Sequence, residues 1–245
     1  MTDNRIRINK FISSNGILSR RKTDEYILQG RITINGITIS EPGYRVVPDT
    51  DKIRIDGELV KLNFKKVYLL LNKPLKTICS VSDEKRRLTV VDLIKIKEKI
   101  FPVGRLDYDS SGLLILTNDG EFANQLMHPK FKISKTYFVN ISKPLDEKYR
   151  EQLMKGVLID YKKTEPCTIK FVNPKDKQNL YITIREGRNR QVRKMFEKHG
   201  YFVRKLHRVE YGNLKLADLQ EGKWRHLTMK ELEELKSLIN KNEIK

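Results

Sequence analysis

The run GRLDYDSSGLLILTNDG at residues 104–120 contains the strongest candidate for chemistry in this chain. An apolar segment at 100–103 leads into a polar turn that ends at Asp107, and a second apolar segment at 113–116 leaves it. Two strands that frame so short a connection can hold one carboxylate rigidly at a cleft. Such a carboxylate can act as a nucleophile or can stabilise positive charge on carbon. The alternative, a solvated acidic loop, explains the glycines but gives no reason for Arg-Leu-Asp at the tip.

A second candidate region lies between Arg185 and Arg208, where nine Lys and Arg residues stand against two acidic ones. This density of positive charge is typical of a phosphate-binding surface. The pattern predicts a helix over 190–199 whose apolar face borders Arg193, so that this side chain can reach the edge of a cleft. For most of the other cations, a solvated helix face is the better interpretation.

A metal site or a disulfide is not expected. Asp107, Asp109 and Asp119 suggest magnesium ligands, but adjacent loop aspartates with no third clustered carboxylate make a poor closed site. Cys79 and Cys167 are far apart and have no neighbouring histidine, so they form no zinc spacing. The four histidines are scattered, and none pairs with a plausible serine or cysteine nucleophile.

The composition favours a polyanion as partner. Lys and Arg number 50 against 31 Asp and Glu in 245 residues, which gives a net charge of +19 and a pI near 9.8. The 38% of hydrophobic residues is enough for a core. Residues 1–10 contain no apolar signal segment, and the longest aliphatic or aromatic run is 67–71. We therefore expect a cytoplasmic protein, with no membrane partner, that acts as a monomer.

Residues 5–62 form a small module of their own in this interpretation. A first helix carries Ile8, Phe11 and Ile12 on one face, and a second helix over 20–29 begins after the N-cap Ser19. Two hairpins follow, with turns at the dipeptides Asn35-Gly36 and Asp56-Gly57.

Three cations, Arg20, Arg21 and Lys22, stand at the start of the second helix. They oppose the helix macrodipole, so they do not stabilise the helix. Their placement makes sense if a phosphate group shares the site, because helix N-termini bind anions. The alternative is an ordinary solvated basic helix start.

The rest of the chain, 67–240 after a polar linker at 61–66, predicts an α+β domain. Strands are expected at 67–71, 100–103, 113–116, 136–141, 168–172 and 180–184. Helices are expected at 121–127, 146–155 and 190–199, and a capping box of Thr228 and Glu231 begins a last helix. The uneven order of strands and helices argues against a doubly wound parallel sheet.

Three further segments accompany the run at 104–120: Asn72-Lys73-Pro74, Lys135-Thr136-Tyr137 and residues 186–195 (EGRNRQVRKM). Together these segments resemble the signature of the pseudouridine synthases. The module at 5–62 is similar to the S4 RNA-binding domain. The combination, which covers nearly the whole chain, is similar to the RsuA family of ribosomal-RNA pseudouridine synthases. It implies a catalytic domain built on a largely antiparallel, mixed sheet with flanking helices.

The resemblance implies a role for each matching residue. Asp107 corresponds to the nucleophile, Arg193 to the cation paired with it, and Tyr137 to the tyrosine that stacks on the target base and can take part in proton transfer. Because a base inside a duplex cannot be reached, the uridine must be flipped out, and Arg105 would fill or brace the space it leaves. The RNA-binding residues implied are Arg105, Arg20, Arg21, Lys22, Arg188 and Arg190. The reaction needs no cofactor, and whether Asp107 attacks the sugar, attacks the base or assists a glycal route stays open.

Three functions remain in competition. The first is isomerisation of a uridine to pseudouridine in ribosomal RNA, with the segments 126–129 and 222–224 favouring a large-subunit enzyme over a small-subunit one. The second is a non-catalytic RNA-binding or ribosome-assembly factor, which would have no use for a carboxylate among phosphates. The third, a metal-dependent nuclease, needs more clustered carboxylates than the sequence contains.

Overall fold

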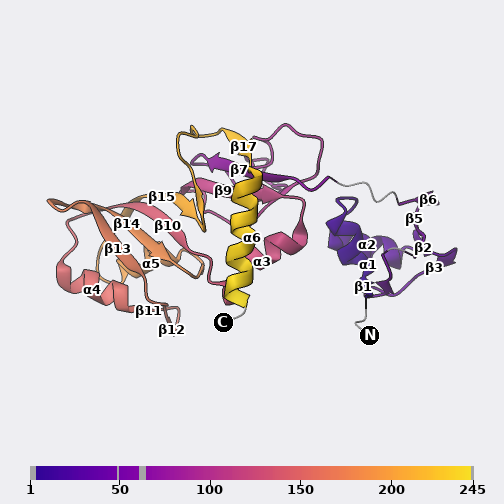
Figure 1. The fold of residues 1–245 in the computed structure, drawn as a ribbon, viewed down its shortest axis with the longest axis horizontal. Coiled ribbons are helices and arrows are strands. Elements are labelled where there is room, and N and C mark those ends of the chain that lie inside the picture. The colour runs from indigo at the N-terminus through magenta and orange to yellow at the C-terminus, as the bar shows by residue number, and fades with distance from the viewer. Residues whose placement is uncertain (1–3, 49, 61–64, 244–245) are drawn as a thin grey trace. The chain divides into compact units, whose positions relative to one another are not determined.

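The computed structural model describes residues 4–48, 50–60 and 65–243, and the linker expected at 61–66 lies mostly outside these ranges. The chain forms two compact units, and the smaller one consists mainly of the chain up to Val67 (Figure 1). Each unit has its own hydrophobic core.

The smaller unit confirms the local predictions for its two helices and two hairpins. Its helices are α1 (Ile8–Ser14) and α2 (Arg20–Leu28), and the side chain of Ser19 accepts a hydrogen bond from the backbone N–H of Lys22 as an N-cap does. The remaining elements are β1 (Ile6–Arg7) paired with β4 (Arg45–Val46), and a sheet in the order β3-β2-β5-β6, formed by β2 (Ile32–Ile34), β3 (Ile37–Thr38), β5 (Ile53–Ile55) and β6 (Glu58–Leu59).

The larger unit is built on a nine-stranded sheet with the main order β13-β14-β10-β15-β9-β7-β17. Its strands are β7 (Tyr68–Lys73), β8 (Phe101–Pro102), β9 (Ser111–Thr117), β10 (Lys135–Ile141), β13 (Thr168–Asn173), β14 (Asp176–Ile184), β15 (Val203–Tyr211), β16 (Leu214–Lys215) and β17 (Trp224–His226). Among its described strand pairs, β9 with β15 is parallel and the others are antiparallel. The predicted mixed, largely antiparallel sheet is confirmed.

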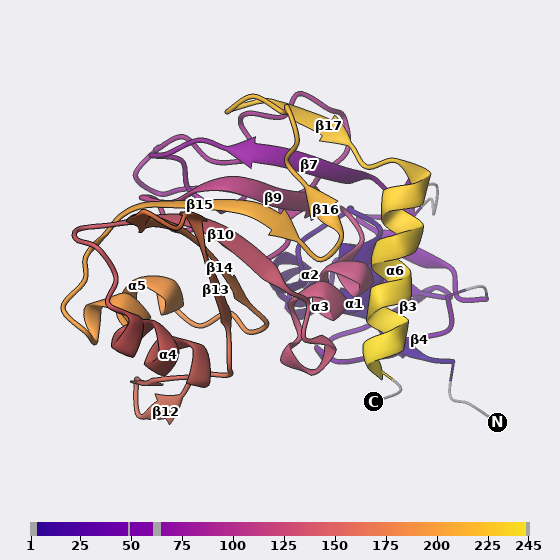
Figure 2. The same cartoon turned by 60° about the vertical axis from the view of Figure 1, so that its left-hand side comes forward.

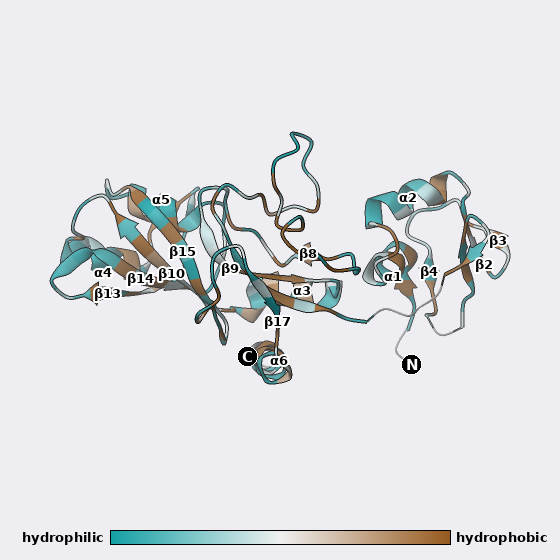
Figure 3. Ribbon diagram, turned by 90° about the horizontal axis from the view of Figure 1, so that it is seen from above, coloured by the Kyte–Doolittle hydropathy of each residue, from teal (hydrophilic) through white to brown (hydrophobic). Residues whose placement is uncertain are grey.

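The strand β15 is an element that the sequence analysis did not predict, although it lies at the centre of the sheet. Its burial alternates only in part, with Leu206 and Arg208 buried and Arg204 and Lys205 exposed. Because one inward position is an arginine, the segment has the composition of a charged surface and the period of a strand is hidden. In the second part of β14, at 180–184, buried aliphatic residues alternate with more exposed ones (Figure 3).

Helices pack against this sheet in two groups (Figure 2). The helices α3 (Gly120–Met127) and α6 (Met229–Glu243), with the 3-10 turn η1 (Pro129–Phe131), share a core with Leu70, Leu113 and Ile115 of the sheet. The helices α4 (Glu147–Lys155) and α5 (Gln191–Glu197) pack near β13 and β15, and a small hairpin of β11 (Leu158–Ile159) and β12 (Lys162–Lys163) lies beside α5. None of the described helices has the length and apolar character needed to cross a membrane.

The predicted capping box at the start of α6 is confirmed. The backbone N–H of Glu231 donates to Thr228 Oγ1 at 3.2 Å, and the backbone N–H of Thr228 donates to Glu231 Oε2 at 2.9 Å. Arg225 pairs with the same carboxylate at 2.6 Å and holds the pKa of Glu231 down to about 2.

Candidate active site

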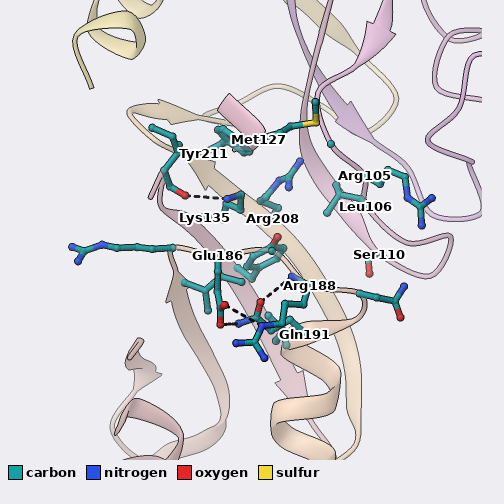
Figure 4. Close-up of a pocket in the computed structure, with 18 of the residues that line it drawn as sticks. Arg105, Leu106, Ser110, Met127, Lys135, Glu186, Arg188, Gln191, Arg208 and Tyr211 are labelled. Carbon is teal, nitrogen blue, oxygen red and sulfur yellow. Dashed lines mark hydrogen bonds and ion pairs between the residues drawn. The ribbon is translucent and has the colours of Figure 1, made fainter. Parts of the chain in front are cut away.

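The segments that carry the candidate residues meet at one pocket of the larger unit, with a volume of about 390 Å³. Its walls come from the loop between β8 and β9, the end of α3 with η1, the strands β10 and β15, and the connection from β14 into α5 (Figure 4). Of the predicted residues, those that line it are Asp107, Tyr137, Arg105, Arg188 and Arg190. A volume of this size is typical of a small-ligand site.

Asp107 lies on a tight turn in which the N–H of Ser110 donates to the Asp107 carbonyl oxygen at 3.1 Å. Lys73 of β7, which has no solvent exposure, binds the backbone of this turn. Its Nζ donates to three backbone oxygens, those of Pro74 at 3.0 Å, Asp107 at 3.2 Å and Ser110 at 2.8 Å. Burial lowers the pKa of Lys73, while the nearby carboxylates, including Asp107, act in the opposite direction. Lys73 thus ties the Asn72-Lys73-Pro74 segment to the turn that carries Asp107, a role that we had not assigned to it.

The ion pair predicted between Arg193 and Asp107 is not formed, and this prediction was wrong in its partner. Arg193 is 5% exposed and binds Asp109, with Nη2 at 3.1 Å from Asp109 Oδ2 and at 2.8 Å from the Asp109 carbonyl oxygen. Its Nη1 also donates to the carbonyl of Val203 at 2.8 Å. Arg193 therefore clamps α5, the start of β15 and the turn together. The turn directs the carboxylate of Asp109, rather than that of Asp107, toward α5.

The cation paired with Asp107 is Arg190, whose Nη1 lies 3.9 Å from Asp107 Oδ2. The same guanidinium lies 3.4 Å from both carboxylate oxygens of Asp109. Arg190 caps the N-terminus of α5 in the left-handed conformation, with φ +51°, which is uncommon for a residue other than glycine. The Asp107 carboxylate is 30% exposed, so it is reachable from the pocket and remains beside a positive charge.

Tyr137 lines the pocket with its aromatic ring, and its expected stacking on the target base stays a prediction. The side chain lies on β10 and is 8% exposed, with the guanidinium carbon of Arg208 6.0 Å from its ring centroid. Arg208 and Lys135 also line the pocket, although neither had been predicted as a site residue. The sequence could have indicated Lys135, because it lies two positions before Tyr137 on the same strand and so shares its face.

The other predicted RNA-binding residues divide into two groups. Arg105 is exposed at the pocket, and Arg20 and Arg21 are exposed at the start of α2 in the smaller unit. Arg188 instead directs its donors at protein atoms: Glu186 at 3.1 Å and the carbonyls of Lys162 and Lys163 in β12. Lys22 pairs with Glu25 at 2.8 Å. These two cations are therefore already engaged within the protein.

Within the described ranges, no three His, Cys, Asp or Glu side chains come together in a group that could hold a metal ion. Cys79 and Cys167 are both free. Burial raises the pKa of both thiols, for Cys167 to about 12, so neither is an activated nucleophile. The arrangement is instead that of one accessible carboxylate beside a cation and an aromatic wall.

Comparisons with known proteins identify the family of both units. Residues 67–198 match the family model of the RNA pseudouridylate synthases, and residues 6–51 match that of the S4 domain. Ribosomal large subunit pseudouridine synthase B of Bacillus subtilis (strain 168) is 44% identical over 238 residues, which cover 96% of this chain and 97% of the relative. The dual-specificity RNA pseudouridine synthase RluF of Escherichia coli (strain K12) is 37% identical over 241 residues, which cover 98% and 81%.

A solved structure leads to the same family. The crystal structure of a pseudouridylate synthase matches with a TM-score of 0.69 at 33% identity, covering 94% of this chain and 99% of that one. The order of the two domains is the one expected of the RsuA family. The chain belongs to the RNA pseudouridylate synthases, and it is an enzyme of that family with an S4 domain before its catalytic domain.

Proposed function

We propose that this enzyme converts a uridine of large-subunit ribosomal RNA to pseudouridine, with Asp107 as the nucleophile. The observation that carries the proposal is the Asp107 carboxylate, which is accessible from the pocket, paired with Arg190 and fixed on a turn that Lys73 holds. The 44% identity to a ribosomal large subunit pseudouridine synthase, over nearly the whole of both chains, supports the choice of RNA.

The chemistry requires the bond from C1′ of the ribose to N1 of uracil to break. The base then turns, and C5 bonds to C1′ while its hydrogen is lost and N1 gains a proton. A carboxylate can assist by attacking the sugar, by attacking the base or by assisting a glycal route, and each route begins with Asp107 next to the target nucleotide. The flipped uracil would stack on Tyr137, and Arg105 would occupy the space it leaves in the RNA.

In this proposal Arg193 has a positioning role that differs from the one expected from sequence. It holds Asp109 and the turn, while Arg190 places its positive charge beside the Asp107 carboxylate. The exposed cations Arg20 and Arg21 would contribute phosphate contacts from the S4 domain. We further propose that the enzyme acts as a monomer in the cytoplasm, where ribosomal RNA is modified.

The test is release of tritium from ribosomal RNA labelled at C5 of uracil, because that hydrogen leaves when pseudouridine forms. The purified enzyme should release tritium from large-subunit RNA without added metal, and Asp107→Asn should lose this activity by at least about a thousandfold. This change keeps the volume of the side chain and removes its charge and nucleophilicity. RNA affinity and thermal stability should stay near those of the wild type.

Two controls make the result decisive. Lys198→Ala, which removes an exposed cation at the C-cap of α5, should keep its turnover at saturating RNA. Small-subunit RNA assayed in parallel decides the subunit, and release from that RNA alone would contradict the large-subunit assignment. Substantial turnover by Asp107→Asn, with deamidation excluded by mass spectrometry, would remove Asp107 from the reaction.

A further inference from the structure

Arg208 brings an unpartnered donor to the pocket. The residue is 2% exposed, and its Nε donates to the carbonyl of Leu113 at 2.7 Å. Its Nη2 is buried and has no hydrogen-bond partner among the described atoms. Buried polar groups in native proteins nearly always have a partner. A guanidinium that lines a ligand pocket with a free N–H is therefore suited to receive an acceptor from the ligand (Figure 4).

Lys135 is a second cation on the same wall, and it is half-buried. Its Nζ donates to the carbonyl of Ile133 at 3.0 Å, which leaves further donor hydrogens of the ammonium for a ligand. Burial and the charge of Arg208 lower its pKa to about 8, and Glu186 acts in the opposite direction. The carboxylate of Glu186 binds Arg188, Gln191 and the N–H of Glu165, so it does not pair with Lys135.

The register of two strands brings these cations to the aromatic wall. In the antiparallel pair of β10 with β15, Lys135 is opposite Tyr211 and Tyr137 is opposite Arg208, with a bulge between the two pairs. Residues three apart on a regular strand face opposite sides of a sheet, so the bulge is what lets Arg208 and Tyr211 share one face. The Tyr211 ring centroid lies 5.1 Å from the Arg208 guanidinium carbon and 5.3 Å from Lys135 Nζ.

We propose that Arg208 and Lys135 form a subsite for the exocyclic oxygens of the flipped uracil. The inference rests on the proposed function, because it takes Tyr137 as the surface on which that base stacks. Cytosine keeps O2 but carries an amino group in place of O4, so it would direct N–H donors at the cation that binds O4 and leave that cation without an acceptor. The subsite would therefore select uracil over cytosine.

The same contacts would assist the reaction. When the C1′–N1 bond breaks with its electron pair going to the base, negative charge spreads over N1, O2 and O4 of uracil. Donors that already point at those oxygens stabilise this charge more than they stabilise the neutral base. In this role both cations donate hydrogen bonds and transfer no proton, so the isomerisation needs no further reactant.

The experiment uses the full-length enzyme and an RNA stem-loop that carries uridine, 2-thiouridine or 4-thiouridine at the target position. Sulfur is a weaker hydrogen-bond acceptor than oxygen, so it weakens one contact at a time. The variants are Lys135→Met, which keeps the apolar stem, and Arg208→Lys, which keeps a positive charge. Lys170→Met, an exposed lysine of β13 outside this pocket, is the control. The measurement is the single-turnover rate at saturating RNA, together with RNA affinity and melting temperature.

We expect Lys135→Met and Arg208→Lys each to lose at least about tenfold in rate on uridine RNA, with RNA affinity changed less than about twofold. Each sulfur substitution should slow the wild-type enzyme. For each variant, the sulfur substitution at the oxygen that its missing cation binds should cause no further loss of rate, because that contact is already gone. The subsite proposal would be overturned if Lys135→Met kept the full wild-type rate. It would also be overturned if both sulfur substitutions slowed both variants by the same factors as they slow the wild type. An inactive wild type on uridine RNA would instead refute the proposed function, so the two failures can be told apart.

Discussion

Two arginines near Asp107, Arg190 and Arg193, make different kinds of contact with its turn. Arg190 lies at the surface of the pocket beside the carboxylate, whereas Arg193 is buried and reaches the backbone of the turn. A lysine could replace the charge of either residue but not the forked geometry of a guanidinium that binds several acceptors at once. The two arginines should therefore respond differently to substitution.

Arg193→Lys should lower both activity and stability. Arg193 uses Nη1 for the carbonyl of Val203 and Nη2 for that of Asp109, whereas lysine has a single nitrogen. The buried charge should therefore lose at least one partner, at a cost of about 2–3 kcal/mol. Displacement of the turn by about 1 Å would lower the single-turnover rate by about a hundredfold. Urea unfolding and the rate at saturating RNA measure the two effects. An unaltered rate in a destabilised protein would show that Arg193 supports the fold without positioning Asp107.

We expect the titration of Lys135 to make the rate at saturating RNA depend on pH. The groups that face it are Arg208, Glu186 and the ring of Tyr211. Burial and the charge of Arg208 lower its pKa to about 8, while Glu186 acts in the opposite direction. A lowered pKa means that the ammonium is present below pH 8 and is lost as the pH rises through that value. The rate at saturating RNA should fall over the same interval in the wild type. Lys135→Met, which has no proton to lose, should lack this step, and the same fall in both proteins would assign it to another group.

At the scale of elements, the contact of β9 with β15 sets the position of Arg208. Gly112 is paired with Arg208 across this parallel contact and has φ +108°, where side chains are rarely tolerated. A Cβ atom on Gly112 would lie 2.3 Å from the Arg208 carbonyl oxygen and 2.5 Å from its backbone nitrogen. Backbone atoms in the middle of a sheet cannot move aside cheaply, so glycine is required here.

Gly112→Ala should therefore destabilise the larger unit by about 2–4 kcal/mol and reduce activity further by displacing Arg208. The free energy of unfolding from urea titration gives the first quantity. Gly187→Ala is the matched control, because its Cβ would meet nothing within 4 Å, and it should change stability by less than about 1 kcal/mol. Equal stability of the two variants would contradict the close approach of the strands.

At the scale of the whole molecule, a net charge of +19 favours RNA binding in general but does not say where the phosphates lie. Several cations of the predicted RNA surface are held by protein partners, as Lys22 is by Glu25 and Arg188 by Glu186. The structure gives Arg20 and Arg21 no ion pair within its described residues. The S4 domain should therefore bind phosphate mainly through these two arginines.

Replacing both residues, in Arg20→Ala/Arg21→Ala, should weaken binding to structured RNA and reduce the slope of log affinity against log salt by about 1.4–1.8. The rate at saturating RNA should stay unchanged, because the catalytic pocket is built from other residues. Lys22→Ala is the control, with a smaller effect on the slope. RNA affinity measured over a range of salt concentrations gives this slope. An unchanged slope in the double variant would mean that Arg20 and Arg21 do not contact the RNA.

The sequence by itself determined the local structure and the family. The Asn35-Gly36 turn, the Ser19 cap and the capping box of Thr228 depend on residues close together in the chain, so short-range rules were sufficient. The run at 104–120 identified the family for the same reason, since its charge and apolar spacing are contiguous.

The tertiary structure decided which groups meet. The contacts of Lys73 with the Asp107 turn, and of Arg208 with Gly112, join residues 34 to 96 positions apart, and no local pattern encodes them. The choice of Asp109 over Asp107 as the partner of Arg193 depends on the direction in which one turn points its side chains. The central strand β15 was not predicted because one of its inward residues is the buried arginine Arg208. A buried arginine needs partners, and only the tertiary structure supplies them.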